Sequence, residues 1–250
     1  MSQRHHEPAA IHRNRGHRTS LWVLGFTVIA AMTVAPAAGR ARESSTATRL
    51  DVDEPLTSYR AFRRMHAKSE RFDQEGWLSA WTEFDGREFR YQIVDERGSE
   101  SVRNKVLKAV LKREQELVAE GPDRAALTDE NYNFTEAEPQ GDGMRYVLLK
   151  PKRKDVMLLE GRMVLTTDGN ELVRVEGKLA KNPSFWTSLV NVIRHFAKVD
   201  GVRVPVSTES VAKVKFAGQS RLDVSYEYES INGRPVSVAA RRMLASAGDR

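Results

Sequence analysis

Two histidines and a row of carboxylates are the residues of this chain best suited to acid–base or metal chemistry. Asp223, Glu227 and Glu229 fall on one face of a predicted strand. Two carboxylates about 5 to 9 Å apart can cleave a glycosidic bond, and Glu227 with Glu229 would meet that spacing. A solvated strand face explains the row equally well, and neither His66 nor His195 has a second metal ligand at a usable spacing. We therefore interpret all of these residues as structural.

Other enzyme signatures are missing from the sequence. The chain has no Cys, which excludes disulfides, thiolate metal sites and a Cys nucleophile. It contains no G-x-S-x-G, no H-E-x-x-H and no phosphate-binding loop, and "GDGMRY" at Gly141 lacks the third Gly of a dinucleotide site. We expect no enzymatic activity, no cofactor and no metal.

The N-terminus has the order of a secretory leader. Four Arg and a single Glu precede the apolar run "LWVLGFTVIAAMTVA", and Ala35 and Ala37 then stand in A-x-A spacing. We predict a signal peptide at residues 1–37, cleaved before Ala38, and hence a periplasmic protein. The alternative is an uncleaved anchor, because 18 uncharged residues from Leu21 to Ala38 approach the length of a membrane span.

Cleavage would change the charge balance of the protein. Removing four Arg and one Glu from 40 basic and 34 acidic residues leaves 36 and 33, a net charge of about +3 instead of +6. The basic character of the full chain therefore comes mostly from the leader. Nucleic-acid binding needs a concentrated basic footprint on a stable domain, so we do not expect it.

The first half of the mature chain is predicted to mix helices and strands. Residues 38–54 are polar and are predicted to be flexible, and residues 55–72 have apolar spacing that suits a helix. Next, "GWLSAWTEFDGREFRYQIVDE" predicts two strands around an Asp-Gly turn. The apolar stripe at residues 100–119 predicts a second helix that ends at Gly121. Residues 122–143 read as a long loop with one helical turn.

From Met144 onward the chain is predicted to be nearly continuous strand. Short turns such as Asp168–Gly169 and Asp200–Gly201 separate the runs, and short turns require antiparallel neighbours. We predict a mainly β (α+β) fold of about eight strands, a strongly curved antiparallel sheet or incomplete barrel with helices on its concave face. One domain would span residues 55–238, and residues 239–250 would form a disordered tail.

The apolar face of this sheet, together with the second helix, is the predicted site for an apolar ligand. It is either a sealed core or the wall of a pocket, because small side chains along residues 202–216 leave room that other side chains must fill. The predicted lining consists of Trp77, Trp81, Val106, Val110, Val173, Val175, Leu179, Val204, Val206 and Val214.

The order of these elements resembles a known family. A helix, two aromatic strands, a helical insert and a meander with "DGNELVRVEGKL", "VDGVRVPVSTES" and "LDVSYEYESING" are similar to the LolA-like periplasmic carriers that sort outer-membrane lipoproteins. The resemblance covers about Leu56 to Asn232. It implies a curved, incomplete barrel that encloses space for acyl chains. The insert at residues 99–143 is more charged than such a lid would be, and no functional residue is carried over.

Two functions from different classes follow from this resemblance and the pattern of the sheet. The first is a monomeric periplasmic carrier or binding protein for a lipid or a lipoprotein acyl chain. The second is an envelope sensor or scaffold whose sheet binds a protein partner without lipid transport. Two further segments have open interpretations. "PKRK" at residues 151–154 is a soluble turn or a contact for lipid phosphates, and "NPSFW" at residues 182–186 is a core plug or a membrane-inserting loop.

Overall fold

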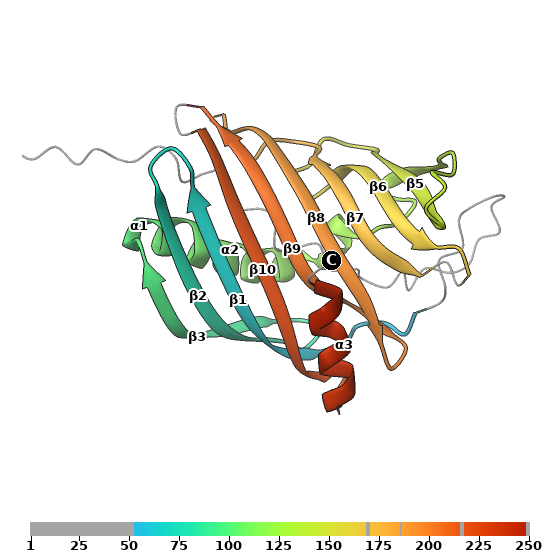
Figure 1. The fold of residues 1–250 in the computed structure, drawn as a ribbon, viewed down its shortest axis with the longest axis horizontal. Helices are drawn as coiled ribbons and strands as arrows, with labels where there is room; N and C mark the ends of the chain where they lie inside the picture. The colour runs from blue at the N-terminus through green and yellow to red at the C-terminus, as the bar shows by residue number, and fades with distance from the viewer. Residues whose placement is uncertain (1–52, 169–170, 186, 216–217, 249–250) are drawn as a thin grey trace, which may run out of the picture.

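The computed structural model describes the backbone of residues 53–168, 171–185, 187–215 and 218–248 (Figure 1). The predicted leader at residues 1–37 and most of the polar segment at 38–54 therefore lie outside the described residues. Within the described ranges, no helix is both long enough and apolar enough to cross a membrane.

One antiparallel sheet dominates the described part of the chain (Figure 1). Its strands lie in the order β3-β2-β1-β10-β9-β8-β7-β6-β5-β4, and the short β11 pairs with β10. The antiparallel meander predicted from residue 144 onward is confirmed. The strand bounds are β1 Tyr59–Ser69, β2 Gln74–Phe84, β3 Phe89–Gly98, β4 Tyr132–Glu136, β5 Met144–Pro151, β6 Leu159–Thr166, β7 Leu172–Leu179, β8 Thr187–Val199, β9 Val202–Val214, β10 Gly218–Ile231 and β11 Arg234–Pro235.

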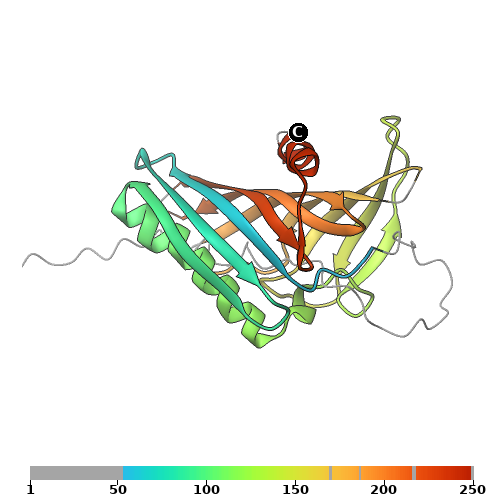
Figure 2. The ribbon, with the colours of Figure 1, turned by 90° about the horizontal axis from the view of Figure 1, so that it is seen from below.

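The sheet is open. β3 and β4 are its two edges and do not pair with each other. Figure 2 shows a sheet that is neither closed nor strongly curled, so the prediction of a strongly curved, incomplete barrel is wrong in this respect. The reason lies in the connection between the edge strands: residues 99–131 contain a helix that packs on one face of the sheet, and the edges stay apart.

β1 replaces the first predicted helix. Residues 59–69 form a strand that pairs with β2 on one side and β10 on the other. Burial alternates along β1, with Ala61, Arg63 and Met65 buried on one face and more exposed residues between them. The prediction of a helix is wrong because Arg63 occupies the middle of the buried face. A charged residue at this position interrupts the alternation of apolar and polar residues that marks a strand.

The second predicted helix is confirmed, and its neighbourhood contains one strand that was not predicted. The helix begins as α1 (Glu100–Val102), continues through a π-helical turn (Arg103–Leu107) and becomes α2 (Lys108–Glu120). Gly121 ends it with a φ of +107°, which L side chains rarely adopt. The predicted loop at residues 122–143 contains a 3-10 helix (Pro122–Ala125) and the edge strand β4.

The helix divides the sheet into two faces. We call the face that α2 covers the inner face, which carries Arg63 and Met65 of β1, and the opposite one the outer face, which carries Phe62. The helix lies along β1, β2 and β3 (Figure 2). A Cβ added to Gly76 of β2 would lie 3.2 Å from Val102 of α1, so a larger residue there would require Val102 to shift by a few tenths of an ångström. Buried side chains of helix and sheet form one hydrophobic core.

The C-terminal segment packs on the outer face. α3 (Val238–Gly248) lies over β8, β9 and β10, on the opposite side of the sheet from α2 (Figures 1 and 2). The Ser237 hydroxyl accepts a hydrogen bond from the Ala240 amide at 3.1 Å, which caps the helix start. Leu244 is buried. The predicted disordered tail at residues 239–250 is therefore wrong as far as Gly248, because this segment buries apolar surface on the sheet.

Candidate functional site

Most of the predicted lining belongs to the packed core. Seven of the ten predicted residues are between 0 and 7% exposed, and a cavity that admits water would leave such side chains accessible. These seven are Val106, Val110, Val175, Leu179, Val204, Val206 and Val214.

Val173 does not lie with them. The pairing of β6 with β7 shifts register here, so that Leu172 pairs with Leu165, Arg174 pairs with Val164 and Val173 is left unpaired between them. Leu172 is buried, whereas Val173 is only half-buried. The bulge shifts the alternation by one residue, and Leu172 takes the core position predicted for Val173.

The two tryptophans face the other way. Trp81 pairs with Phe62 and Trp77 pairs with His66, and all four side chains lie on the outer face. The prediction that Trp77 and Trp81 share an interior with the valines is wrong. Both faces of β2 follow the same period of two, and the helix packs on the face with the smaller residues, among them Gly76 and Ala80.

A buried ion pair joins the helix to the inner face. Arg63 Nη1 and Nη2 donate to the two carboxylate oxygens of Glu114 at 2.5 and 2.8 Å, and both side chains are nearly inaccessible. Arg63 also donates to the Tyr59 hydroxyl at 2.6 Å, and its guanidinium lies 4.7 Å from the Tyr226 ring and 5.0 Å from the Phe89 ring. Burial disfavours the charged form of Arg63, but the Glu114 carboxylate beside it holds the pKa of Arg63 above its usual range. The pair fixes where α2 sits on the sheet.

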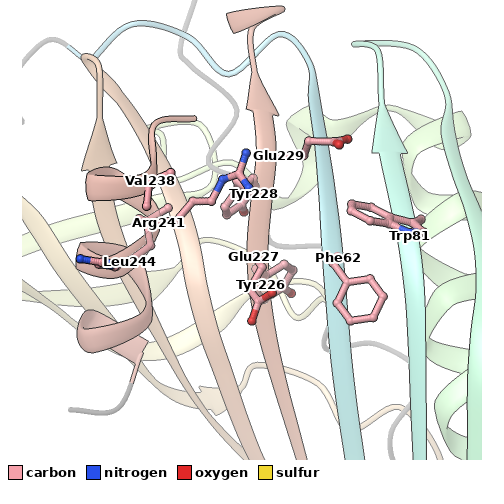
Figure 3. Close-up of a pocket in the computed structure, with 10 residues that line it drawn as sticks. Phe62, Trp81, Tyr226, Glu227, Tyr228, Glu229, Val238, Arg241 and Leu244 are labelled. Atoms are coloured by element: carbon pink, nitrogen blue, oxygen red, sulfur yellow. The ribbon is translucent and has the colours of Figure 1, made fainter. Parts of the chain in front are cut away.

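An open groove lies on the outer face, between α3 and strands β1, β2 and β10 (Figure 3). Its volume is about 300 Å³. The aromatic side chains of β1 and β2 lie on one side of it and the side chains of α3 on the other. The lining residues are Phe62, Trp81, Tyr226, Glu227, Tyr228, Glu229, Val238, Arg241, Arg242 and Leu244.

The sheet side of the groove carries aromatic rings and an arginine whose charge is paired with carboxylates of the sheet. The Phe62 and Trp81 rings meet edge to face, with centroids 5.2 Å apart. The Arg60 guanidinium lies 4.4 Å from the Trp81 ring and makes ion pairs with Glu83 at 3.1 Å and Glu229 at 2.6 Å. The arginine charge on this side is therefore satisfied by carboxylates of neighbouring strands.

The helix side of the groove differs in its charge. Val238 and Leu244 supply apolar surface, and Arg241 reaches from α3 over β10 (Figure 3). Arg241 Nε donates to the Val236 carbonyl at 3.1 Å. Within the described part of the chain, neither Arg241 nor Arg242 forms an ion pair with a carboxylate. The groove therefore combines an apolar floor with two cationic side chains at one wall.

A second, shallower hollow of about 460 Å³ lies on the same face, next to Trp77. The His66 and Trp77 rings stack with centroids 4.8 Å apart, and His66 Nε2 lies 3.2 Å from Glu75. Charged residues such as Arg221 and Asp223 surround these rings. The hollow is wider and more polar than the groove, so the groove is the better candidate for an apolar ligand.

The residues considered for acid–base chemistry occupy ordinary strand positions. Asp223 pairs with Arg221 at 2.9 Å, and Glu227 and Glu229 pair with arginines of β1. Burial, together with the charge of Arg174, lowers the pKa of His195. No cluster of three or more metal-binding side chains occurs among the described residues.

The sequence prediction missed most of the groove. Trp81 was named as a lining residue, although for the wrong face, while Phe62 and the α3 residues Val238, Arg241 and Leu244 were not named. The available indication was "VAARRML", whose apolar residues recur at helical spacing.

Three solved structures match this chain at low sequence identity and low TM-score. A LolA superfamily protein from Nitrosomonas europaea matches over 69% of this chain and 86% of its own, with 11% identity and a TM-score of 0.33. A putative outer membrane lipoprotein-sorting protein domain from Vibrio parahaemolyticus matches over 78% and 93%, with 9% identity and a TM-score of 0.36.

A third match is a structure of lipovitellin that describes its lipid–protein interactions. It covers 74% of this chain and 26% of its own, with 7% identity and a TM-score of 0.26. No family model and no curated protein matches the sequence. At these TM-scores, the similarities say nothing about a ligand.

Proposed function

We propose that this protein is an exported binding or carrier protein for an apolar ligand, a lipid or an acyl chain, held in the groove between α3 and the outer face. This site lies on the outer face of the sheet and not on the helix-covered face that the sequence pattern predicts. The envelope-sensor function remains the alternative, with a protein segment in place of the lipid.

The observation that carries this proposal is the open aromatic floor of the groove. Phe62 and Trp81 border a groove of about 300 Å³, whereas seven of the ten residues of the predicted lining are buried in the core. Aromatic side chains left accessible in a concave site provide the apolar burial that holds a hydrophobic ligand, at about 25 cal/mol per Å².

The charges of the groove favour a ligand with an acidic group. Arg60 is neutralised by Glu83 and Glu229, so it offers little to a ligand. Arg241 and Arg242 have no carboxylate partner in the described ranges, and a guanidinium binds carboxylate or phosphate oxygens in a bidentate manner. A fatty carboxylate, with its chain on the aromatic floor and its head at α3, matches both walls.

Binding of a fluorescent fatty acid tests the proposal. Trp81→Ala should weaken binding by about 30-fold or more, because truncating an aromatic anchor typically costs 2 kcal/mol or more. Trp77→Ala is the matched control: it removes the same ring from the same strand and face, but outside the groove. It should leave binding unchanged.

Two results would count against the groove. If Trp81→Ala binds the probe as the parent does and Val206→Trp does not, the ligand site lies on the inner face after all. If the parent binds no fatty acid but retains an envelope protein through the groove, the sensor alternative is correct.

We propose export through the predicted leader as part of this function. The mature chain would then begin near Ala38 in the periplasm and act as a monomer. N-terminal sequencing of protein recovered from the periplasm should return the residues after Ala37. Recovery of Met1 from membranes alone would favour the uncleaved anchor.

A further inference from the structure

Three connections of the sheet come together at one end of the strands, the end where β9 finishes in Figure 1. Leu159 at the start of β6 pairs with Leu179 at the end of β7, and Thr187 at the start of β8 pairs with Val214 at the end of β9. We call this end the basic loop end. It comprises residues 150–154, 178–185 and 213–215, and it unites the "PKRK" segment with residues 182–185.

The basic loop end is rich in exposed cations. Its lysines and arginine are Lys150, Lys152, Arg153, Lys154, Lys178, Lys181, Lys213 and Lys215, all of them exposed. Several have partners: Lys178 pairs with Glu160 at 3.2 Å, Arg153 lies 3.5 Å from Asp155, and Lys152 donates to the Asp129 carbonyl.

Six of these lysines have no carboxylate partner in the described ranges, although Lys152 donates to a backbone carbonyl. They are Lys150, Lys152, Lys154, Lys181, Lys213 and Lys215. Three exposed acids lie at the same end of the sheet without an ion pair: Asp129 and Glu130, which precede β4, and Glu70, whose carboxylate accepts a hydrogen bond from Gln219 at 3.1 Å. The cations are therefore available to an anionic partner outside the protein.

A large aromatic side chain stands among these cations. Phe185 is 77% exposed, the most exposed of the large hydrophobic side chains that are described. The Lys215 ammonium lies 4.2 Å from the centre of its ring. An exposed aromatic ring surrounded by lysines suits the boundary between anionic headgroups and acyl chains, where the ring leaves water and the lysines meet phosphates.

We propose that the basic loop end docks on the surface of an anionic membrane, with Phe185 entering the headgroup region. The charge of these lysines selects an anionic bilayer, and the single ring provides shallow, reversible attachment. This docking does not depend on whether the groove holds a ligand, since the groove and the basic loop end are formed by different residues.

Sedimentation with vesicles tests the proposal on the protein as recovered from cells. Vesicles of phosphatidylcholine mixed with phosphatidylglycerol should bind the protein at low salt and release it at high salt, and pure phosphatidylcholine should bind it weakly. Replacing Lys154 and Lys181 by Gln should weaken binding about 25- to 30-fold, because each lysine near an anionic surface contributes about fivefold. Phe185→Ala should weaken binding several-fold.

A matched variant controls for net charge. Arg87→Gln with Lys112→Gln removes the same charge from exposed residues of the β2–β3 turn and α2, and it should bind vesicles as the parent does. Equal losses in both double variants, or no binding of the parent to anionic vesicles, would overturn the proposal. So would retention by an envelope protein but not by vesicles.

The same variants separate this proposal from the proposed function. Trp81→Ala should keep vesicle binding and lose the fatty acid, whereas the Lys154 and Lys181 variant should do the reverse. If only one of the two activities is absent from the parent protein, only the corresponding proposal fails.

Discussion

The ion pair between Arg63 and Glu114 offers the sharpest test of how the helix sits on the sheet. It connects the middle of β1 with α2 through two hydrogen bonds, and each side chain is about 2 to 3% exposed. We consider two single changes, Arg63→Met and Glu114→Leu, and their combination.

The expected losses follow from what each change leaves behind. Removing one member of a buried pair strands the other charge and costs about 3 to 5 kcal/mol. The loss of stability in Arg63→Met should lie at the upper end of this range, because Glu114 has no other ion-pair or hydrogen-bond partner in the described ranges. The loss in Glu114→Leu should lie at the lower end, because Arg63 still donates a hydrogen bond to the Tyr59 hydroxyl and still contacts two aromatic rings.

The double variant should behave differently. Replacing both charges by apolar side chains of similar size removes the desolvation penalty together with the attraction, so its stability should equal or exceed that of the parent by about 1 to 4 kcal/mol. The free energies of unfolding in urea, followed by far-UV circular dichroism, give the three values and the coupling between the two sites.

Glu227→Gln is the control for this experiment. It breaks the pair of Arg64 and Glu227 on the outer face, where both side chains are 54% exposed, and should cost about 1 kcal/mol or less. If the two buried single variants also lost less than about 1 kcal/mol, or if their losses simply added in the double variant, the helix would not be packed on the inner face as described.

Three further predictions concern the core, the sheet and the pH dependence. Val206→Trp should overpack the core and lose about 1 to 3 kcal/mol in urea denaturation without changing fatty-acid binding; unchanged stability would reveal empty space on the inner face. Gly161→Ala should lower the melting temperature, since its Cβ would lie 2.0 Å from the Glu176 carbonyl oxygen and the strands would have to move. The pKa of His195 is lowered, so the unfolded chain takes up its proton first and stability should fall as pH drops below about 6.5; His195→Asn should flatten that dependence, and an unchanged slope would refute the assignment.

The meander was predictable because its turns have strong local requirements. Asp200 and Gly201 both adopt positive φ, +49° and +85°, as the tight turn between β8 and β9 demands. Short turns then force antiparallel neighbours, so the order β5 to β10 follows from the chain itself. The pairing of β1 with β10 could not be predicted from the sequence, because these strands are far apart in the chain and no local pattern links them.

β1 shows where prediction from the spacing of apolar residues fails. Its buried face includes Arg63, and a charged residue is normally predicted to be exposed. The remaining apolar residues then fit helical spacing. The burial of Arg63 depends on Glu114, which lies 51 positions later in the chain. The strand could therefore be recognised only by a partner that the local window does not contain.

The candidate site was misplaced for a related reason. The alternation in β2 separates Trp77 and Trp81 from Leu78 and Ala80, but it does not say which set meets the helix. That choice depends on how closely α1 and α2 can approach, and the small side of β2 allows the closer approach. The tryptophans are then left on the outer face, where α3 is the only helix of the described residues that covers the sheet. The consequence is that the larger aromatic surface, which seemed to belong to the core, is the part of the sheet that remains accessible to a ligand.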